Sequence, residues 1–366
     1  MNVMNLPLAE KTNIKNWAFE ALVLKELVSS TIDGTGVETK DNQLVIVDGY
    51  MVYNTLPSSL KIKVGVDDKK FYKEDATKNK LLNLNVQARN SVLEMVVEKN
   101  THVMEDISVV VVGKDQSLIH ETKLTLETGA SLNLVETYVN VESFNANIVS
   151  ELKVGENAKL VMNTVSDMKH HSVVYHHKHT EIERDGVLDA TNFIINDANM
   201  VFEDFTHLLG PGSEVDVKTV SIASGHQQQN ITVRTENIAG HTVANIVNYG
   251  IVKDEAHLAF NGVGKIEKAA KESDNQQETR LLNLSKTAEA VANPFLLIDE
   301  GDITAGHAAS IGQLDEEQIY YLMSRGMSKS EASKMIVSGF LAPFVDVIDD
   351  EGMKETLSAK MEKKLG

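Results

Sequence analysis

The sequence contains no cysteine, only 5 prolines in 366 residues, and no long hydrophobic run. The lack of cysteine excludes disulfides, thiolate nucleophiles and any cysteine-ligated zinc or iron–sulfur centre that this chain supplies alone. No apolar stretch approaches the roughly 18 to 20 residues that span a bilayer. The N-terminus also lacks the charged and apolar regions of a signal peptide. We therefore expect a cytoplasmic protein.

The charge balance is strongly acidic. Lys and Arg total 35 against 53 Asp and Glu, which gives a net charge of −18. Such a field repels phosphate backbones and anionic lipid surfaces, so we expect neither nucleic acid nor a membrane as partner. The 42% hydrophobic and 24% charged residues are ordinary for a globular protein.

Hydrophobic periodicity divides the chain into three parts. Residues 1–42 form a predicted N-terminal helical segment, because apolar side chains recur at helical spacing over residues 15–27. Trp17 is expected to anchor this segment to the body. Residues 43–305 are a predicted β core, made of short β-branched or alternating stretches separated by Gly, Asn and Asp. Residues 306–366 are predicted to be helical again.

A weak repeat within the β core indicates its architecture. Residues 126–135 align with residues 152–161 at an offset of 26, with Gly129 matching Gly155. A turn glycine followed by an alternating strand, at a period in the twenties, favours stacked coils of a β-solenoid. A β-sandwich is the alternative, since regular short strands also fit that fold.

The C-terminal part carries helix-start sequences. Asp315 and Ser328 each stand where an N-cap residue would begin a helix. Gly326 and Gly339 are the expected ends of these two short helices. The apolar residues 340–348 that follow are too hydrophobic for a free surface tail, so we expect them to pack on the body or on a partner.

Five histidines gather in one short stretch. Imidazoles bind transition metals, and His177 and His179 would share one face of a strand, which makes them candidate metal ligands. An exposed histidine-rich strand pair is the favoured reading, since no diagnostic ligand spacing surrounds them. The full set is His170, His171, His176, His177 and His179.

Two functional alternatives follow from these residues. A His-rich metal-binding protein is one, and a β-helix enzyme acting on polysaccharide is the other. The second would use paired carboxylates such as Asp185 and Asp189. Solvated turn residues explain that pair more simply, and no phosphate loop, nucleophile elbow or zinc-protease helix occurs in the chain.

Residues 306–326 closely resemble the C-terminal signature of the SufB/SufD family of iron–sulfur cluster assembly proteins. Residues 293–298 and 260–266 also fit the family pattern. The resemblance implies a right-handed parallel β-helix flanked by small helical N- and C-terminal parts. It also implies a scaffold subunit that is not an enzyme.

The chain departs from the SufB pattern at the residues that separate the two branches. Glu278 stands at the aligned position of the SufB cysteine, and Ala308 follows His307 where SufB carries a His-Glu pair. Both departures point to the SufD branch. Ala305 replaces a cysteine that many SufD chains carry two residues before the histidine, so any role of that thiol is absent.

The resemblance also implies partners and site residues. It suggests pairing with a SufB-like paralogue, binding of a SufC-like ATPase, and a homodimer as an option for the isolated chain. His307 carries over as the interface histidine for cluster assembly and as a candidate iron ligand. No stably bound cofactor is expected, only a transient iron–sulfur cluster shared with SufB. The expected SufC contacts are Ile319, Tyr320, Leu322, Met323, Arg325, Met335 and Ile336.

Overall fold

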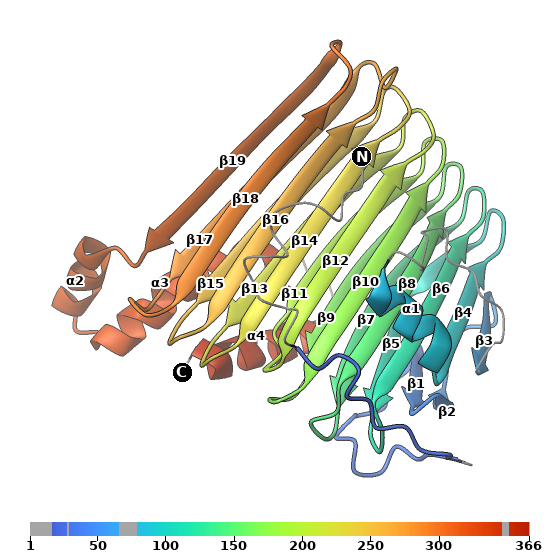
Figure 1. Cartoon of the computed structure of the whole chain (residues 1–366), viewed down its shortest axis with the longest axis horizontal. Coiled ribbons are helices and arrows are strands. Elements are labelled where there is room, and N and C mark those ends of the chain that lie inside the picture. Colours follow the sequence, from blue (N-terminus) through green and yellow to red (C-terminus); the bar gives the residue numbers. More distant parts are fainter. Residues whose placement is uncertain (1–16, 28, 66–78, 346–350, 366) are drawn as a thin grey trace.

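A computed structural model of the chain describes residues 17–27, 29–65, 79–345 and 351–365, with side chains of the last range described from residue 354. These residues form a parallel β-solenoid. Two sheets, one of ten strands and one of nine, face each other along the molecule and enclose one core (Figure 1). The prediction of a solenoid is confirmed, and the β-sandwich alternative is wrong.

Each coil contributes one strand to each sheet. The first sheet contains β1 (Gln43–Val47), β2 (Tyr50–Asn54), β5 (His102–Gly113), β7 (Ser131–Asn140), β9 (Lys159–Asp167), β11 (Val187–Ile194), β13 (Glu214–Ala223), β15 (Val243–Val252), β17 (Ser273–Asn283) and β19 (Ile303–Gln313). The second sheet contains β3 (Leu60–Gly65), β4 (Ser91–Val97), β6 (Leu118–Leu126), β8 (Ala146–Val154), β10 (Val173–Ile182), β12 (Asn199–Leu208), β14 (Gln228–Asn237), β16 (His257–Ile266) and β18 (Glu289–Ile298).

Alternation within each strand builds the core. In β7, for example, Leu132 and Leu134 point inward and are 1% exposed, whereas Asn133 between them is exposed. Parallel stacking keeps the inward positions of successive coils in register, so Leu132 lies opposite Leu160 and Leu134 opposite Met162. The inward rows merge into one hydrophobic cluster along the solenoid.

The repeat seen in the sequence is displaced from the true stacking. Leu126 pairs with Val154 and Leu132 pairs with Leu160, a separation of 28 rather than 26 positions. The 26-residue alignment matched Gly129 with Gly155 because both occupy turns. The displacement is an even number, so it does not exchange the inward and outward faces of the strands.

The two ends of the solenoid differ. At the N-terminal end, β2 adds to β1 and β3 adds to β4, both antiparallel, so β2 and β3 are the outermost strands there. At the C-terminal end, β19 and β18 are the last strands of their sheets, and no described strand lies beyond them. From His307 to Gln313, every residue of β19 is exposed. We call this surface, formed by β18 and β19, the open end.

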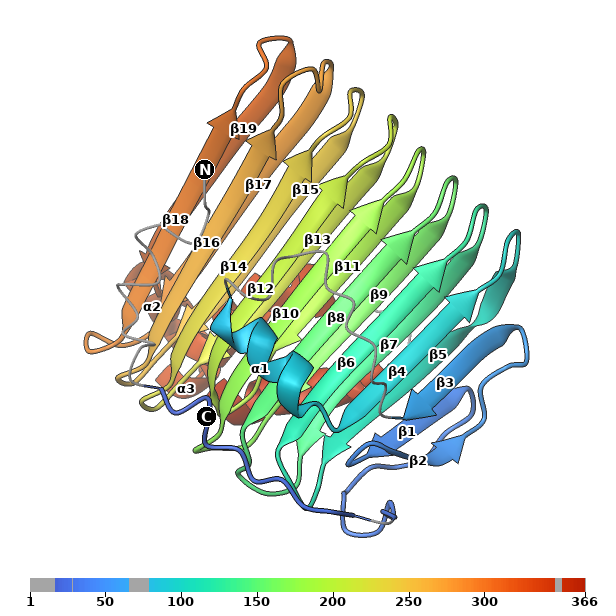
Figure 2. The ribbon, with the colours of Figure 1, turned by 45° about the vertical axis from the view of Figure 1, so that its right-hand side comes forward.

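Helices cover parts of both sheets. The bounds are α1 (Lys80–Ala88), α2 (Glu316–Ser324), α3 (Lys329–Val345) and α4 (Glu351–Leu365). Figures 1 and 2 show α1 on the outside of the second sheet and α3 and α4 on the outside of the first sheet, while α2 stands beyond β19. Helix α1 was not predicted. Its buried Asn85 donates to the backbone oxygens of His120 and Asn147, which fixes the helix to the sheet.

The predicted N-terminal helix is wrong for the described residues. Residues 17–27 form turns and extended chain, because tertiary hydrogen bonds replace helical ones: the amide of Val23 donates to Ser117 Oγ. Asn145 also donates to the backbone oxygens of Ala18 and Ala21. The anchoring role of Trp17 is confirmed, since its ring lies 5.8 Å from that of Phe19 in a cluster on the second sheet.

The helix-start predictions are confirmed. Asp315 caps α2 by accepting from the amides of Glu317 and Gln318. Ser328 and Glu331 form a reciprocal capping box at the start of α3, with distances of 2.7 and 3.2 Å. Gly326 lies just past the end of α2 with a φ of 99°, as expected of a helix-ending glycine.

Two expected boundaries in this region are wrong. Helix α3 continues through Gly339 to Val345, because Leu341 and Phe344 beyond the glycine are buried against the first sheet. Phe344 lies 4.6 Å, ring to ring, from Tyr249 of β15. This packing confirms that the apolar segment contacts the body as far as residue 345; residues 346–350 lie outside the described part. The boundary expected after residue 305 falls inside β19.

Among the described residues, no helix combines the length and the apolar character needed to cross a membrane.

Candidate functional site at the open end and the α2 helix

His307 lies in the last strand, on the inward row. It stands opposite Gln277 of β17, which is 5% exposed and faces the core, and adjacent parallel strands present paired residues on the same face. The imidazole is nevertheless exposed, because no described strand covers β19. His307 is therefore an inward-facing side chain that has no coil above it.

Beneath His307, the last two coils contain buried amides with unsatisfied oxygens. Asn248 Oδ1, Asn275 Oδ1 and Gln277 Oε1 are all buried and have no hydrogen-bond donor among the described residues. Two glycines of β16 make room for these side chains. A Cβ at Gly262 would lie 2.8 Å from Gln277 Oε1, and one at Gly264 would lie 2.2 Å from Asn275 Oδ1.

Glu278, at the aligned position of the family's cysteine, points the other way. It accepts a 3.2 Å hydrogen bond from the Tyr249 hydroxyl on the outside of the first sheet, and it forms an ion pair with Arg280. Its partner in β19 is Ala308, the outward neighbour of His307. The carboxylate and the imidazole thus lie on opposite faces of the same sheet.

A polar row runs through the interior toward the open end, and sequence reasoning missed it. Its members follow the stacking register on the inward face of the first sheet, and each is at most 5% exposed. The row consists of Glu136, Thr164, Asn192, Thr219, Asn248 and Thr279. Only the corrected coil length shows that these six residues align.

Lys178 of β10 reaches this row from the second sheet. Its ammonium donates to Thr164 and Asn192 at 3.1 and 2.9 Å and lies 3.6 Å from Asp204. Burial raises the pKa of Glu136 near the start of the row, although hydrogen bonds from Thr122 and Tyr138 act against it. The interior therefore holds ionisable groups whose charges are stabilised by buried hydrogen bonds and ion pairs instead of by water.

The histidine-rich stretch is divided among three environments. His176 points into the core, while His177 and His179 share the outer face of β10, as predicted. His170 and His171 occupy the preceding exposed turn, and His171 has a φ of 64°. His171 does not share the outer face of His177, because a turn separates it from the strand.

The two outer histidines have separate partners. His177 Nδ1 lies 3.0 Å from Glu203. Burial, helped by the charge of neighbouring His207, lowers the pKa of His179 to about 4. Among the residues that the structure describes, no three His, Asp or Glu side chains are arranged to hold a metal ion.

The carboxylates considered for an enzyme do not meet in a cleft. Asp185 lies in a turn with a φ of 52°, and Asp189 forms a 2.9 Å ion pair with Lys218 on a sheet surface. Neither residue lines the two hollows described below.

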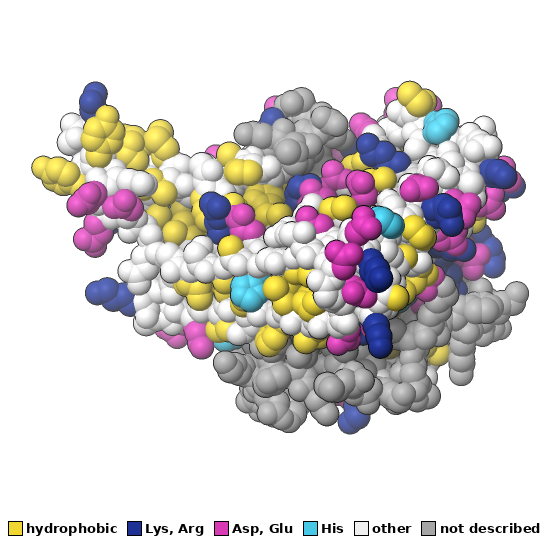
Figure 3. Space-filling model, turned by 90° about the horizontal axis from the view of Figure 1, so that it is seen from above, with side chains coloured by type: hydrophobic (Ala, Val, Ile, Leu, Met, Phe, Trp, Pro, Cys, Tyr) yellow, Lys and Arg dark blue, Asp and Glu magenta, His cyan; other side chains and the backbone are white. Residues whose placement is uncertain are grey.

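Helix α2 projects from the solenoid with apolar side chains on its surface. Figure 3 shows hydrophobic side chains gathered on this projecting part. Tyr320, Tyr321 and Met323 of α2 are 74%, 56% and 44% exposed, and Met335 of α3 is 53% exposed. Single exposed apolar residues are common, but four on one helical pair are typical of a protein contact surface.

The predicted contact residues are split between this surface and internal packing. Ile319 is buried, and Leu322 and Ile336 are half-buried. Tyr320, Met323 and Met335 are exposed, so their side chains can contact a partner. Arg325 is exposed, and its guanidinium lies 5.2 Å from the ring of Tyr321. Tyr321 was not among the predicted contact residues.

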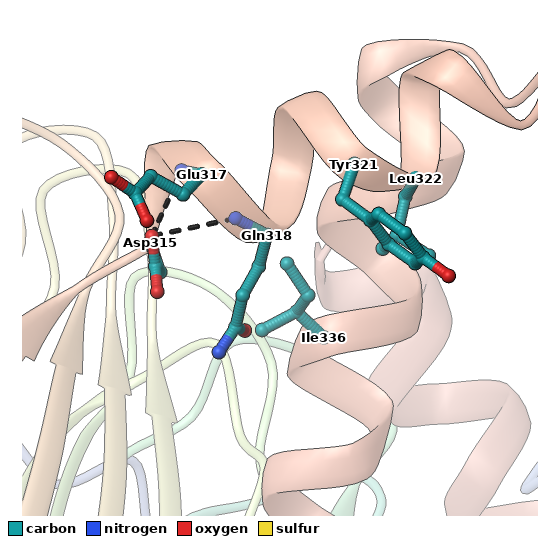
Figure 4. A pocket seen from close by; sticks show the side chains of 6 residues that line it. All are labelled: Asp315, Glu317, Gln318, Tyr321, Leu322 and Ile336. Carbon is teal, nitrogen blue, oxygen red and sulfur yellow. Dashed lines mark hydrogen bonds between the residues drawn. The ribbon is translucent and has the colours of Figure 1, made fainter.

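A hollow lies on each side of α2. The first, about 390 Å³, is lined by Asp315, Glu317, Gln318, Tyr321, Leu322 and Ile336, and Figure 4 shows these side chains around it. The second, about 680 Å³, separates α2 from the turn at residues 283–286 and includes Lys286 and Lys329. The first hollow is thus lined by two carboxylates, whereas the second combines two lysines with Glu316.

Comparison with known proteins identifies the class. Residues 109–340 match the family model "SUF system FeS cluster assembly, SufBD core domain". An iron–sulfur cluster assembly protein SufD of Bacillus subtilis is 33% identical over 98% of this chain and 90% of its own length. A SufD of Escherichia coli is 23% identical over 98% of this chain and 89% of its own length, and a SufBD family protein of Mycobacterium tuberculosis is 24% identical over 75% and 72%.

The chain belongs to the SufBD family of the SUF system, which assembles iron–sulfur clusters. The relatives matched over nearly the whole chain carry the name SufD, in agreement with the branch that the sequence predicts.

Proposed function

We propose that the chain is a non-catalytic scaffold subunit of iron–sulfur cluster assembly. In this role it pairs with a SufB-like, cysteine-bearing paralogue at its open end and binds a SufC-like ATPase through α2 and α3. It works in the cytoplasm and binds a cluster only transiently. The observation that carries the proposal is the open end of a SufBD-family solenoid, where β18 and β19 are edge strands with exposed apolar side chains.

The open end supports pairing with a second solenoid. Strand edges carry backbone groups that an added strand can satisfy, and proteins normally cover them. The edge here also carries apolar side chains: Leu297 and Ile298 of β18 and Ile311 of β19 are 38%, 37% and 51% exposed. A partner of the same fold would continue both sheets and bury these residues.

The α2 surface supports binding of a separate protein. It follows directly after β19 and projects beyond the end of that strand (Figure 1). Its exposed tyrosines and methionines are the residue types that enrich the centres of protein interfaces.

His307 supports a role at the joint between the two solenoids. The chain has no thiol, so the paralogue must supply the thiolates, while an imidazole can ligate iron or accept a proton. Its inward position at the open end would place it between the two stacked cores.

Co-purification tests the two contacts separately. The full chain should retain both the paralogue and the ATPase, and it should hydrolyse no ATP alone. A Tyr320→Ala, Met323→Asp double variant should lose the ATPase and keep the paralogue, while Met104→Asp, at an 84% exposed residue of β5, should keep both. An ATPase that still binds the double variant as tightly as wild type would refute the α2 contact.

His307→Ala tests the joint. We expect the variant to fold and to assemble with both partners, but to build clusters more slowly on the complex. His226→Ala, which removes an 81% exposed imidazole elsewhere, is the matched control. Unchanged iron loading of the His307 variant would exclude the histidine from cluster assembly.

A further inference from the structure

A row of asparagines on the outer face of the second sheet ends at the open end. Asn293 of β18 stands opposite Asn261 of β16, and its Nδ2 donates a 3.1 Å hydrogen bond to Asn261 Oδ1. Asn261 Nδ2 in turn donates to Asn230 Oδ1 of β14 at 2.8 Å. We call these three residues the asparagine ladder. Each of its two hydrogen bonds is donated away from the open end.

The direction of these bonds leaves an acceptor at the end of the ladder. Asn261 directs Oδ1 toward β18 and Nδ2 toward β14, and a second Nδ2 hydrogen bond, to Thr232 at 3.1 Å, fixes this orientation. Asn293 donates in the same direction, so its Oδ1 lies on the side of the open end. No described residue donates to that oxygen.

The backbone of β18 has an interrupted row of donors at the same place. The amide of Glu289, at the start of β18, and that of Asp299, just after its end, both donate to the coil of β16 at 2.9 Å. Alternate residues of a strand bond to opposite sides, so the even-numbered residues of β18 direct their N–H groups to the open end. Pro294 is one of them and has no N–H. A strand added to β18 therefore finds no backbone donor at the centre of the edge.

We propose that Asn293 is a specificity-determining residue of the joint between the two solenoids. The strand of the paralogue that stacks on β18 carries an asparagine or a glutamine opposite Asn293, and the amide of that residue donates to Asn293 Oδ1. The ladder thus continues into the second solenoid. This inference rests on the proposed function, because it needs the paralogue at the open end.

A neutral amide suits this position better than a charged donor. The outward neighbours of Asn293 in β18 are Val291 and Phe295, which are apolar and half-buried. A lysine or an arginine beside them would lose its water when the joint closes, and an amide has a smaller desolvation cost. Stacked strands lie about 4.8 Å apart, the spacing across which Asn293 already bonds to Asn261.

The ladder and the gap at Pro294 together favour one partner and one register. A strand without a donor at this position would bury Asn293 Oδ1 unsatisfied, which costs free energy. The missing N–H of Pro294 removes a hydrogen bond that an unrelated extended segment could otherwise use. Side-chain recognition at Asn293 therefore adds the selectivity that a bare strand edge lacks.

A double-mutant cycle tests the inference. Asn293→Leu removes the acceptor from the full chain with little change of volume. In the paralogue, each outward Asn and Gln of the last two strands is changed to Leu in turn, and affinities are measured by isothermal titration calorimetry. Asn133→Leu is the matched control, because Asn133 of β7 also donates to a neighbouring coil, at 3.0 Å to Asp106 of β5, but lies far from the open end.

We expect Asn293→Leu to lower the affinity by roughly tenfold, and Asn133→Leu to leave it within about twofold of wild type. For one Asn or Gln of the paralogue, the double variant should bind no more than about twofold more weakly than Asn293→Leu alone, because both changes break the same hydrogen bond. Thermal unfolding of the isolated chain checks that each variant folds. If Asn293→Leu does not fold, Asn293→Ala must give the same coupling.

Two results would overturn the inference alone. One is wild-type affinity of the Asn293 variant, and the other is a set of losses that simply multiply for every Asn and Gln tested in the paralogue. Failure of the two wild-type chains to bind each other overturns the proposed function first.

Discussion

At the scale of single residues, the interior of this solenoid is less uniform than its hydrophobic alternation indicates. Lys178 is 1% exposed and depends on Asp204 and neighbouring amides for solvation. Nothing in the local sequence marks it as buried, since a lysine in a strand usually faces water. Its burial follows from parity: it lies two positions from the inward-facing His176.

Removing the charge of Lys178 should therefore be costly. Lys178→Met leaves Asp204 buried without its cation, and we expect a loss of about 3 to 5 kcal/mol in the free energy of unfolding. Lys153→Met removes one partner of a far more exposed pair with Glu183 and should cost less than about 1 kcal/mol. Urea unfolding measures both, and equal losses would mean that the buried pair contributes nothing special.

Buried neutral histidines predict acid sensitivity. Burial lowers the pKa of His120 to about 3, and burial with the charge of His207 lowers that of His179 to about 4, from an unfolded value of 6.5. Below pH 6.5 the unfolded chain binds protons that the folded chain does not, so stability falls as the pH falls. Each group should cost about 2 kcal/mol between pH 7 and pH 5.

His120→Gln removes one of these two groups. The loss of unfolding free energy between pH 7 and pH 5, measured by urea unfolding at both pH values, should then shrink by about 2 kcal/mol relative to wild type. A variant whose loss equals that of wild type would show that His120 is protonated in the folded chain at pH 5.

At the scale of elements, the sequence correctly predicted those strands and helix starts that interactions between neighbouring residues determine. The strand at Gln43 and the helix starts at Asp315 and Ser328 follow from alternation and capping, which neighbouring residues fix. The segment around Trp17 has the spacing of a helix but is held extended by hydrogen bonds to Ser117 and Asn145, which the sequence alone does not bring near. Gly339 does not end α3 either, because Leu341 and Phe344 beyond it are buried against the first sheet, a contact that the local sequence does not reveal.

The docking of α3 on the first sheet gives an element-scale prediction. Phe344→Ala should loosen α3, because the ring is 1% exposed and packs on Tyr249. We expect faster amide hydrogen exchange over residues 329–345 with little change in the solenoid. Met335→Ala on the exposed face of α3 is the control and should leave exchange unchanged; similar effects of both variants would contradict this packing role.

At the scale of the whole molecule, the fold could be predicted but the candidate site only in part. The coil architecture and the family follow from the repeat and the signature around His307. The polar row from Glu136 to Thr279 could not be found, because it depends on coil lengths that vary between 26 and 32 positions in the stacking. An error of a single position exchanges the inward and outward faces.

The open end predicts a residue that controls association. Ile311→Lys places a charge on the inward row of the last strand, where a covering partner would have to desolvate it. We expect a loss of at least tenfold in affinity for the paralogue, measured by analytical ultracentrifugation, with unchanged thermal unfolding of the isolated chain. Met104→Lys should leave the affinity as it is. Wild-type affinity of the Ile311 variant would place the contact elsewhere.

A strand edge binds the backbone of another segment whatever side chains that segment carries, so β18 and β19 offer hydrogen bonds to any extended segment they meet. A cell that makes this subunit faster than the proposed SufB-like paralogue would accumulate molecules that pair with wrong partners and aggregate. Balanced synthesis of the two subunits, or rapid removal of the surplus, is therefore as much a requirement of this architecture as the residues that line its core.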